Sequence, residues 1–113
     1  MENPKTPSIP PYDKHVFVCT GPRCAPETSP ALYAQLKARL KELGLGEGPK
    51  KMNRTQCNCF GICQGGPIVV VYPEGTWYHH VTPEKLERII QEHVIQDNPV
   101  QEVIFHQKGS DPF

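Results

Sequence analysis

The sequence predicts one small α/β (α+β) domain, in which two helices flank a small mixed sheet. The chain has 113 residues, about the length of a single domain. Two segments repeat apolar residues at helical spacing, and short apolar runs bounded by proline and glycine lie between them. Hydrophobic residues make up 37% of the chain, which is enough for a core, so wholesale disorder is not expected.

The first helix is expected over residues 30–43. Ser29 can accept a hydrogen bond from a free N–H group at the start of the helix, and Pro30 suits the first helical position. Gly44 ends the pattern. The apolar stripe of this helix consists of Leu32, Leu36, Leu40 and Leu43.

The second helix is expected to begin at Thr82-Pro83, where the same pattern of a capping side chain followed by proline recurs. Glu84 and Arg88 are spaced to form an ion pair across one turn, and Pro99 prevents the helix from continuing. Its apolar stripe consists of Leu86, Ile89, Ile90 and Val94.

Four short segments are expected to be strands: residues 15–18, 51–56, 67–72 and 76–78. The unbroken apolar run Ile68–Val71 is typical of a strand buried on both faces. Pro73-Glu74-Gly75 predicts a turn that joins the last two strands as a hairpin. Residues 100–105 are apolar but have no clear period.

Proline is unusually frequent, with 13 residues, and four of them fall in the first eleven positions. We therefore interpret residues 1–14 as an extended tail, residues 15–98 as the folded domain and residues 99–113 as a C-terminal tail. A proline-binding partner for the first segment is less favoured, because no repeated PxxP pattern is present.

Five cysteines form two groups, C-x4-C and C-x-C-x3-C. They are Cys19, Cys24, Cys57, Cys59 and Cys63. An odd number argues against a disulfide framework, and no pair has the C-x-x-C spacing of a thioredoxin-type dithiol. Both groups follow predicted strands, so two loops can bring the thiols together at one pole of the domain.

Four such thiolates can hold one tetrahedral zinc ion or the two irons of a [2Fe–2S] cluster. Zinc sites usually use tighter C-x2-C turns. A cluster also needs N–H donors for its negatively charged sulfurs, and the loop with Gly61, Gly65 and Gly66 can supply them. The spacing favours the cluster only modestly, so a zinc-stapled interaction module stays open as the alternative.

The formal net charge is zero, which gives no pull toward nucleic acid or anionic membranes. The longest aliphatic run is four residues, far below a membrane span, and the first residues lack the apolar stretch of a secretory signal. We therefore expect a cytoplasmic protein. Residues 37–54 are locally basic and residues 84–102 locally acidic, a layout that can steer a redox partner but is more often solvated surface.

The string from Cys59 to Tyr78 carries a resemblance to a known family. It contains C-F-G-I-C-Q-G-G-P, then V-V-V-Y-P-E-G and W-Y, and His15–Cys19 matches the family's opening. Over about residues 15–95 the chain resembles the thioredoxin-like [2Fe–2S] ferredoxins of the Shethna-protein type. The resemblance implies a thioredoxin-like fold, a homodimer and one-electron transfer between redox partner proteins.

The resemblance also implies the ligands. Cys19 takes the place of the family's first ligand, Cys24 of the second, and Cys59 and Cys63 of the last two. Only four residues separate Cys19 from Cys24, whereas the family often has a longer insertion. Cys57 is a fifth thiol, which we interpret as a bystander.

The remaining residues favour an electron carrier over an enzyme, because no acid–base or nucleophilic constellation and no phosphate loop is recognisable. Trp77 and Tyr78 are expected in packing, near a dimer interface in a protein of this family. His79 and His80 are expected on opposite faces of a strand, and so not to chelate one ion.

Overall fold

The computed structural model describes residues 6–9, 11–21, 25–48, 50–58 and 65–108. In these residues five strands form one mixed sheet with the order β2-β1-β3-β4-β5. β1 and β2 are parallel, and the other neighbours are antiparallel. The strands are β1 (Lys14–Cys19), β2 (Met52–Cys57), β3 (Val69–Tyr72), β4 (Thr76–Tyr78) and β5 (Ile104–Gln107).

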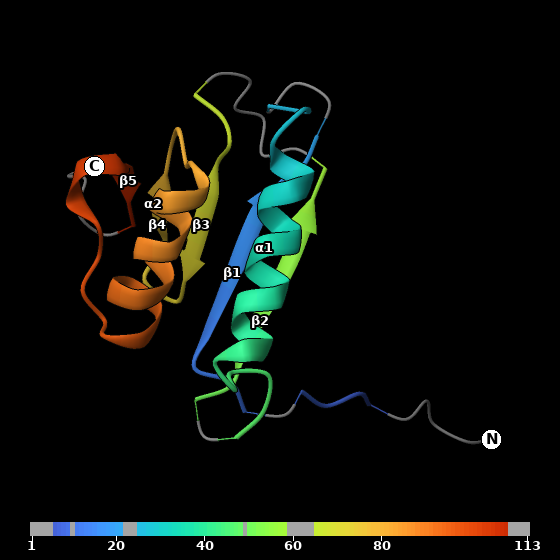
Figure 1. The fold of residues 1–113 in the computed structure, drawn as a ribbon. Coiled ribbons are helices and arrows are strands. Elements are labelled where there is room, and N and C mark those ends of the chain that lie inside the picture. The colour runs from blue at the N-terminus through green and yellow to red at the C-terminus, as the bar shows by residue number, and fades with distance from the viewer. Residues whose placement is uncertain (1–5, 10, 22–24, 49, 59–64, 109–113) are drawn as a thin grey trace.

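Two helices pack on the same face of this sheet (Figure 1). Helix α1 (Ser29–Glu42) lies over β1 and β2. Helix α2 (Pro83–Arg88) continues directly into a π-helical segment, η1 (Ile89–Ile95), and lies over β3 and β4. The prediction of a small α/β domain with two helices on a mixed sheet is confirmed, and both helices lie on one side.

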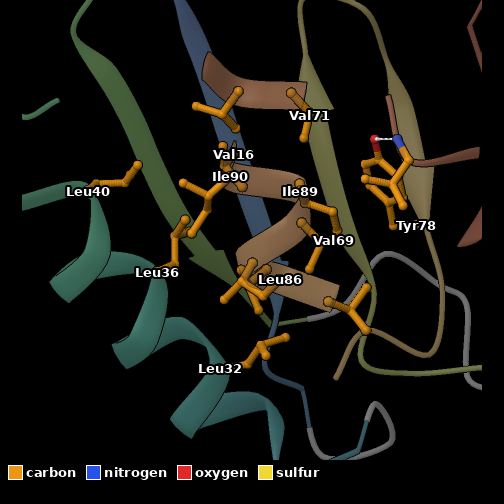
Figure 2. Close-up of a cluster of buried hydrophobic side chains, with 14 of the residues drawn as sticks. Val16, Leu32, Leu36, Leu40, Val69, Val71, Tyr78, Leu86, Ile89 and Ile90 are labelled. Carbon is orange, nitrogen blue, oxygen red and sulfur yellow. Dashed lines mark hydrogen bonds between the residues drawn. The ribbon is translucent and has the colours of Figure 1, made fainter. Parts of the chain in front are cut away.

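The main core fills the space between the helices and the sheet (Figure 2). It confirms both predicted apolar stripes, since Leu32, Leu36 and Leu40 of α1 are buried and Leu43 packs at the edge. From the second stripe, all four residues are buried: Leu86, Ile89, Ile90 and Val94. Val16 and Val18 of β1 reach the same core, so alternate residues of β1 point to the other face.

The two helix starts differ from each other. Thr82 caps α2 as predicted, because its Oγ1 accepts a hydrogen bond of 3.2 Å from the Lys85 amide. At α1 the prediction was wrong: the N-cap residue is Thr28, without a side-chain cap, and Ser29 is already helical. The Ser29 hydroxyl donates instead to the Ala25 carbonyl at 2.9 Å. Pro30 still occupies the first turn.

The expected pair of Glu84 and Arg88 is also replaced. Arg88 bonds to Glu92 at 3.0 Å, on the next turn, and to Glu102 at 2.8 Å. Glu102 lies in the turn before β5, so this arginine ties the second helical segment to the chain that follows it.

Residues 99–113 were expected to form a tail, and this expectation needs correction. A short 3-10 turn, η2 (Gln101–Val103), leads into β5, which pairs with β4 as an edge strand. Val100 and Val103 are buried in the main core. The strand was missed because its burial pattern is shallow: Ile104, His106 and Gln107 are only partly buried and Phe105 is exposed.

No described helix covers the second face of the sheet. We call it the open face and define it by Phe17, Tyr72 and Trp77, which are partly buried around a small cluster of Cys19, Ile68 and Val70. Rings meet on it: Phe17 and Tyr72 pack edge to face with centroids 6.1 Å apart. The open face is therefore apolar and aromatic although it lacks a helical layer.

A buried polar network closes the end of the sheet where β1 begins. Lys14 is 3% exposed and contacts Glu74 at 2.7 Å and Asp97 at 2.6 Å. The other oxygen of Glu74 lies 2.9 Å from Nε2 of His93, whose Nδ1 lies 2.7 Å from the hydroxyl of Tyr78. Burial opposes the charge on Lys14, but its hydrogen bonds to Asp97 and Glu74 raise the pKa overall.

Burial also shifts the pKa of two further members of this network, His93 and Tyr78. It lowers the pKa of His93, although the hydrogen bond with Glu74 opposes the shift. It raises the pKa of Tyr78 to about 12, which keeps this hydroxyl neutral.

None of the described helices is both long and apolar enough to cross a membrane.

The lowered pKa of His93 predicts how stability depends on pH. The folded state holds this imidazole neutral at pH values where the unfolded chain, with a pKa near 6.5, takes up a proton. The contribution of His93 is therefore complete above about pH 6.5 and is lost as the pH falls toward the folded pKa. Urea unfolding across this range should show a steeper loss of stability in the wild type than in His93→Gln. Equal slopes would contradict the prediction.

Candidate metal centre

The parallel pairing of β1 with β2 brings two cysteines to the same end of the sheet. Their register pairs Lys14 with Met52 at one end and Cys19 with Cys57 at the other. Just beyond the pair, the Thr20 amide donates to the Cys57 carbonyl at 2.8 Å. The loops that follow both strands therefore leave the sheet side by side, as the sequence predicted for one pole of the domain.

Cys19 is fully buried at this end, on the open face. Its amide donates to the Ile68 carbonyl at 3.1 Å, which fixes the backbone against the chain entering β3. Its Sγ lies 4.0 Å from the carbonyl oxygen of Asn58. Since Cys59 follows Asn58 directly, the second cysteine group begins beside the first thiol.

The glycine loop before β3 is fastened to the segment that follows β4. The His80 amide donates to the Gly65 carbonyl at 2.7 Å, and the Val81 amide donates to the Pro67 carbonyl at 3.2 Å. Gly65 has a φ of 78°, in the left-handed region that other residues rarely adopt. Gly65 and Pro67, on the chain that enters β3, are thus fastened to the segment after Tyr78.

Cys24, Cys59, Cys63 and Gly61 lie outside the described residues. Within the described ranges, no group of three or more His, Cys, Asp or Glu side chains is arranged to hold a metal ion. The part of the site that is described fits a thiolate-bound centre: a buried thiol at a strand end, a neighbouring strand whose sequence continues into two more cysteines, and Gly65 fastened to the segment after β4.

Cys57 differs from Cys19 in its surroundings. It is partly buried, and its Sγ lies 3.6 Å from the carbonyl oxygen of Val18 on the neighbouring strand. The sulfur thus interacts with backbone inside the sheet pairing. Cys57 also packs against the cluster of Cys19, Ile68 and Val70, and its interpretation as a bystander thiol stays a prediction.

The two histidines after β4 correct one sequence expectation, and the aromatic residues of β4 confirm that they take part in packing. β4 ends at Tyr78, and His80 has a φ of 48°, so the backbone bends and brings Nδ1 of His79 within 2.7 Å of Nδ1 of His80. The two rings therefore meet on one side. Tyr78 points into the helix-covered core, whereas Trp77 packs on the open face.

The fold and this end of the sheet define a small α/β domain with a thiolate centre on converging loops. A family model for the thioredoxin-like [2Fe–2S] ferredoxins matches residues 8–94. A [2Fe–2S] ferredoxin of Clostridium pasteurianum is 35% identical over 99 residues, 83% of this chain and 89% of the relative. One of Aquifex aeolicus is 31% identical over 110 residues, 88% of this chain and 94% of the relative.

Solved structures agree. A thioredoxin-like [2Fe–2S] ferredoxin from Aquifex aeolicus matches with a TM-score of 0.73 at 29% identity, covering 88% of this chain and 94% of that one. The wild-type protein from the same organism, in a 1.5 Å crystal structure, gives a TM-score of 0.71 at 30% identity, covering 82% of this chain and 96% of that one.

The chain belongs to the thioredoxin-like [2Fe–2S] ferredoxin family. It is an electron carrier that binds a [2Fe–2S] cluster and exchanges electrons with redox partners. When bound, the cluster supplies the redox chemistry, and the chain holds it.

The conformation of Gly65 can be tested by substitution. A Cβ on Gly65 would meet only ordinary contacts, the nearest being Cε1 of His80 at 3.7 Å, so the left-handed φ is the main penalty. Gly65→Ala should lower the free energy of unfolding by about 1–2 kcal/mol and speed the loss of visible absorbance on heating. Gly46→Ala is the matched control, since nothing lies within 4 Å of its Cβ position. Equal effects would contradict the prediction.

Proposed function

We propose that this ferredoxin binds its cluster through Cys19, Cys24, Cys59 and Cys63. The observation that supports this set most strongly is the register that puts Cys19 beside the start of the Cys59 loop. Cys24 is the other cysteine of the loop after β1. Four thiolates are the complement that a [2Fe–2S] cluster requires.

Backbone N–H groups of Gly61, Gly65 and Gly66 are proposed to donate to the cluster sulfurs. The left-handed conformation of Gly65 and its carbonyl bond to the His80 amide support this role, because they fix the orientation of the backbone at Gly65 itself. Such donors favour the reduced, more negative state and so raise the reduction potential.

Serine substitutions test the ligand set one position at a time. Replacing any of Cys19, Cys24, Cys59 or Cys63 should abolish or shift the visible spectrum, because a serine oxygen is a harder ligand than a thiolate sulfur. Absorption and electron paramagnetic resonance of the reduced protein measure the change.

Cys57→Ser is the control for this series, since it removes the thiol at the end of β2, two residues before Cys59. It should leave both spectra unchanged. If Cys57→Ser bleaches the protein while Cys59→Ser keeps its spectrum, the ligand set is wrong at this point, and Cys57 rather than Cys59 binds the cluster.

We further propose a homodimer in which a second copy covers the open face. The family resemblance implies a dimer, and the aromatic side chains of Phe17, Tyr72 and Trp77 give this face the composition of an interface core. Trp77, the bulkiest of them, is the expected anchor.

Charge placed at the anchor should separate the subunits. Trp77→Glu is expected to weaken the dimer by at least about thirtyfold, as measured by sedimentation equilibrium. Gln96→Glu, on an exposed position outside the open face, should leave the mass at two chains. If the wild type sediments as a single chain, or if Trp77→Glu stays dimeric, the open face is not the interface.

The composition of the sequence supports a proposal about the location and the partners of this protein. We propose a cytoplasmic electron carrier that is not an enzyme and binds neither nucleic acid nor membrane, supported by the odd number of thiols and the zero net charge. The N-terminal segment 1–13 is proposed to be a tail outside the domain; the expected bound of residue 14 was one residue too long, because Lys14 is buried and begins β1. Its described positions before Lys14 are all exposed, which supports this.

A further inference from the structure

A groove of about 620 Å³ runs along the outer edge of β2, at the side of the domain away from α2. It is lined from both faces of the sheet. On the helix side, Arg54 donates to the hydroxyl of Tyr33 in α1 at 3.2 Å. On the open face, Thr55 lies 2.7 Å from Nε2 of His15. The groove, here called the β2 groove, therefore wraps around the strand edge itself.

The backbone at this edge is available for pairing. The inner side of β2 faces β1, where the Lys51 carbonyl accepts from Asp13 and the Cys57 carbonyl accepts from Thr20. Backbone groups alternate in direction along a strand, so the odd-numbered residues of β2 face β1 and the even-numbered residues face outward. The Met52 amide confirms this direction, because it donates to the Leu45 carbonyl at 2.7 Å, outside the sheet.

Arg54 is the next outward residue, in the middle of the groove. Within the described chain, no backbone hydrogen bond is made to its outward N–H or carbonyl. The groove thus presents a donor and an acceptor at the spacing that an added strand uses.

The lining of the groove is strongly basic. Lys37, Lys41, Lys51 and Arg54 line it, and Glu47 is the one carboxylate among the described lining residues. None of these four cations takes part in an ion pair with another described residue. Four unneutralised charges around one strand edge favour an anionic occupant.

We propose that the β2 groove binds an extended acidic segment of another protein, which adds to the sheet as a strand beside β2. A second copy of this chain is a poorer occupant, because the acidic side chains of its helical face are already engaged: Glu87 by Arg39, and Glu92 and Glu102 by Arg88. A nucleic acid matches the charge but not the peptide edge.

The groove reaches Thr55, and β2 ends two residues later at Cys57, so a segment that continues along the strand runs toward the cysteine end of the sheet. The groove would therefore hold a redox partner on the strand that leads to the proposed cluster loop. Binding at the groove is measured without reference to electron transfer, so its failure is distinguishable from a failure of the proposed ligand set.

The test uses the purified holoprotein and a short fluorescein-labelled peptide that alternates glutamate with threonine. Fluorescence anisotropy should show binding that weakens with salt. A second peptide with the central threonines replaced by proline keeps the charge but loses the strand hydrogen bonds, and it should bind about tenfold more weakly. Hydrogen exchange should show slower exchange of the Arg54 amide when the first peptide is bound.

Charge reversals locate the site. Lys37→Glu and Lys41→Glu are on exposed helix positions and leave the core unchanged, so both variants should fold and bind the peptide about tenfold more weakly. Glu47→Gln should tighten binding. Lys108→Glu, on the opposite edge of the sheet, is the matched control and should have no effect.

Three results would overturn the proposal. The first is no binding of the glutamate–threonine peptide. The second is equal binding of the proline peptide, with no protection of the Arg54 amide. The third is equally tight binding of a single-stranded oligonucleotide that displaces the peptide, which would make the groove a general surface for polyanions.

Discussion

The parallel pairing of β1 with β2 is the constraint on which the rest of the molecule depends. Hydrogen bonds between the two strands set Cys19 opposite Cys57, and thus fix where both cysteine loops leave the sheet. A slip by one residue would turn Cys19 from the open face into the helix-covered core, because side chains alternate along a strand. Val16 and Val18 oppose such a slip, since both are fully buried against the helices.

The two faces of the sheet are covered unequally. Packing both helices on one face places the bulk of the core there and leaves the open face with a thin aromatic layer. Cys19 is already fully buried beneath this layer, and a second protein chain on this face would cover the aromatic side chains themselves. The edge of β2 remains outside both layers, which is why its basic side chains are free to receive a different partner.

Residues with a strong local pattern were predictable. The leucine stripe of α1, the Thr82 cap and the buried run Val69–Val71 were all read correctly from spacing alone. β5 was not, because an edge strand next to a 3-10 turn buries too few side chains to show a period. The contacts of Arg88 and the meeting of His79 with His80 depend on backbone bends that no pattern encodes.

The proposed ligand set rests more on the cysteine pattern of the sequence than on the geometry of the structure, since three of the four proposed ligands are outside the described residues. Metal and sulfide content therefore test the central claim most directly. Anaerobically purified protein should contain two irons and two acid-labile sulfides per chain, with a paramagnetic signal after reduction by one electron. One zinc per chain with neither iron nor sulfide would contradict it and leave a zinc-stapled domain on the same sheet.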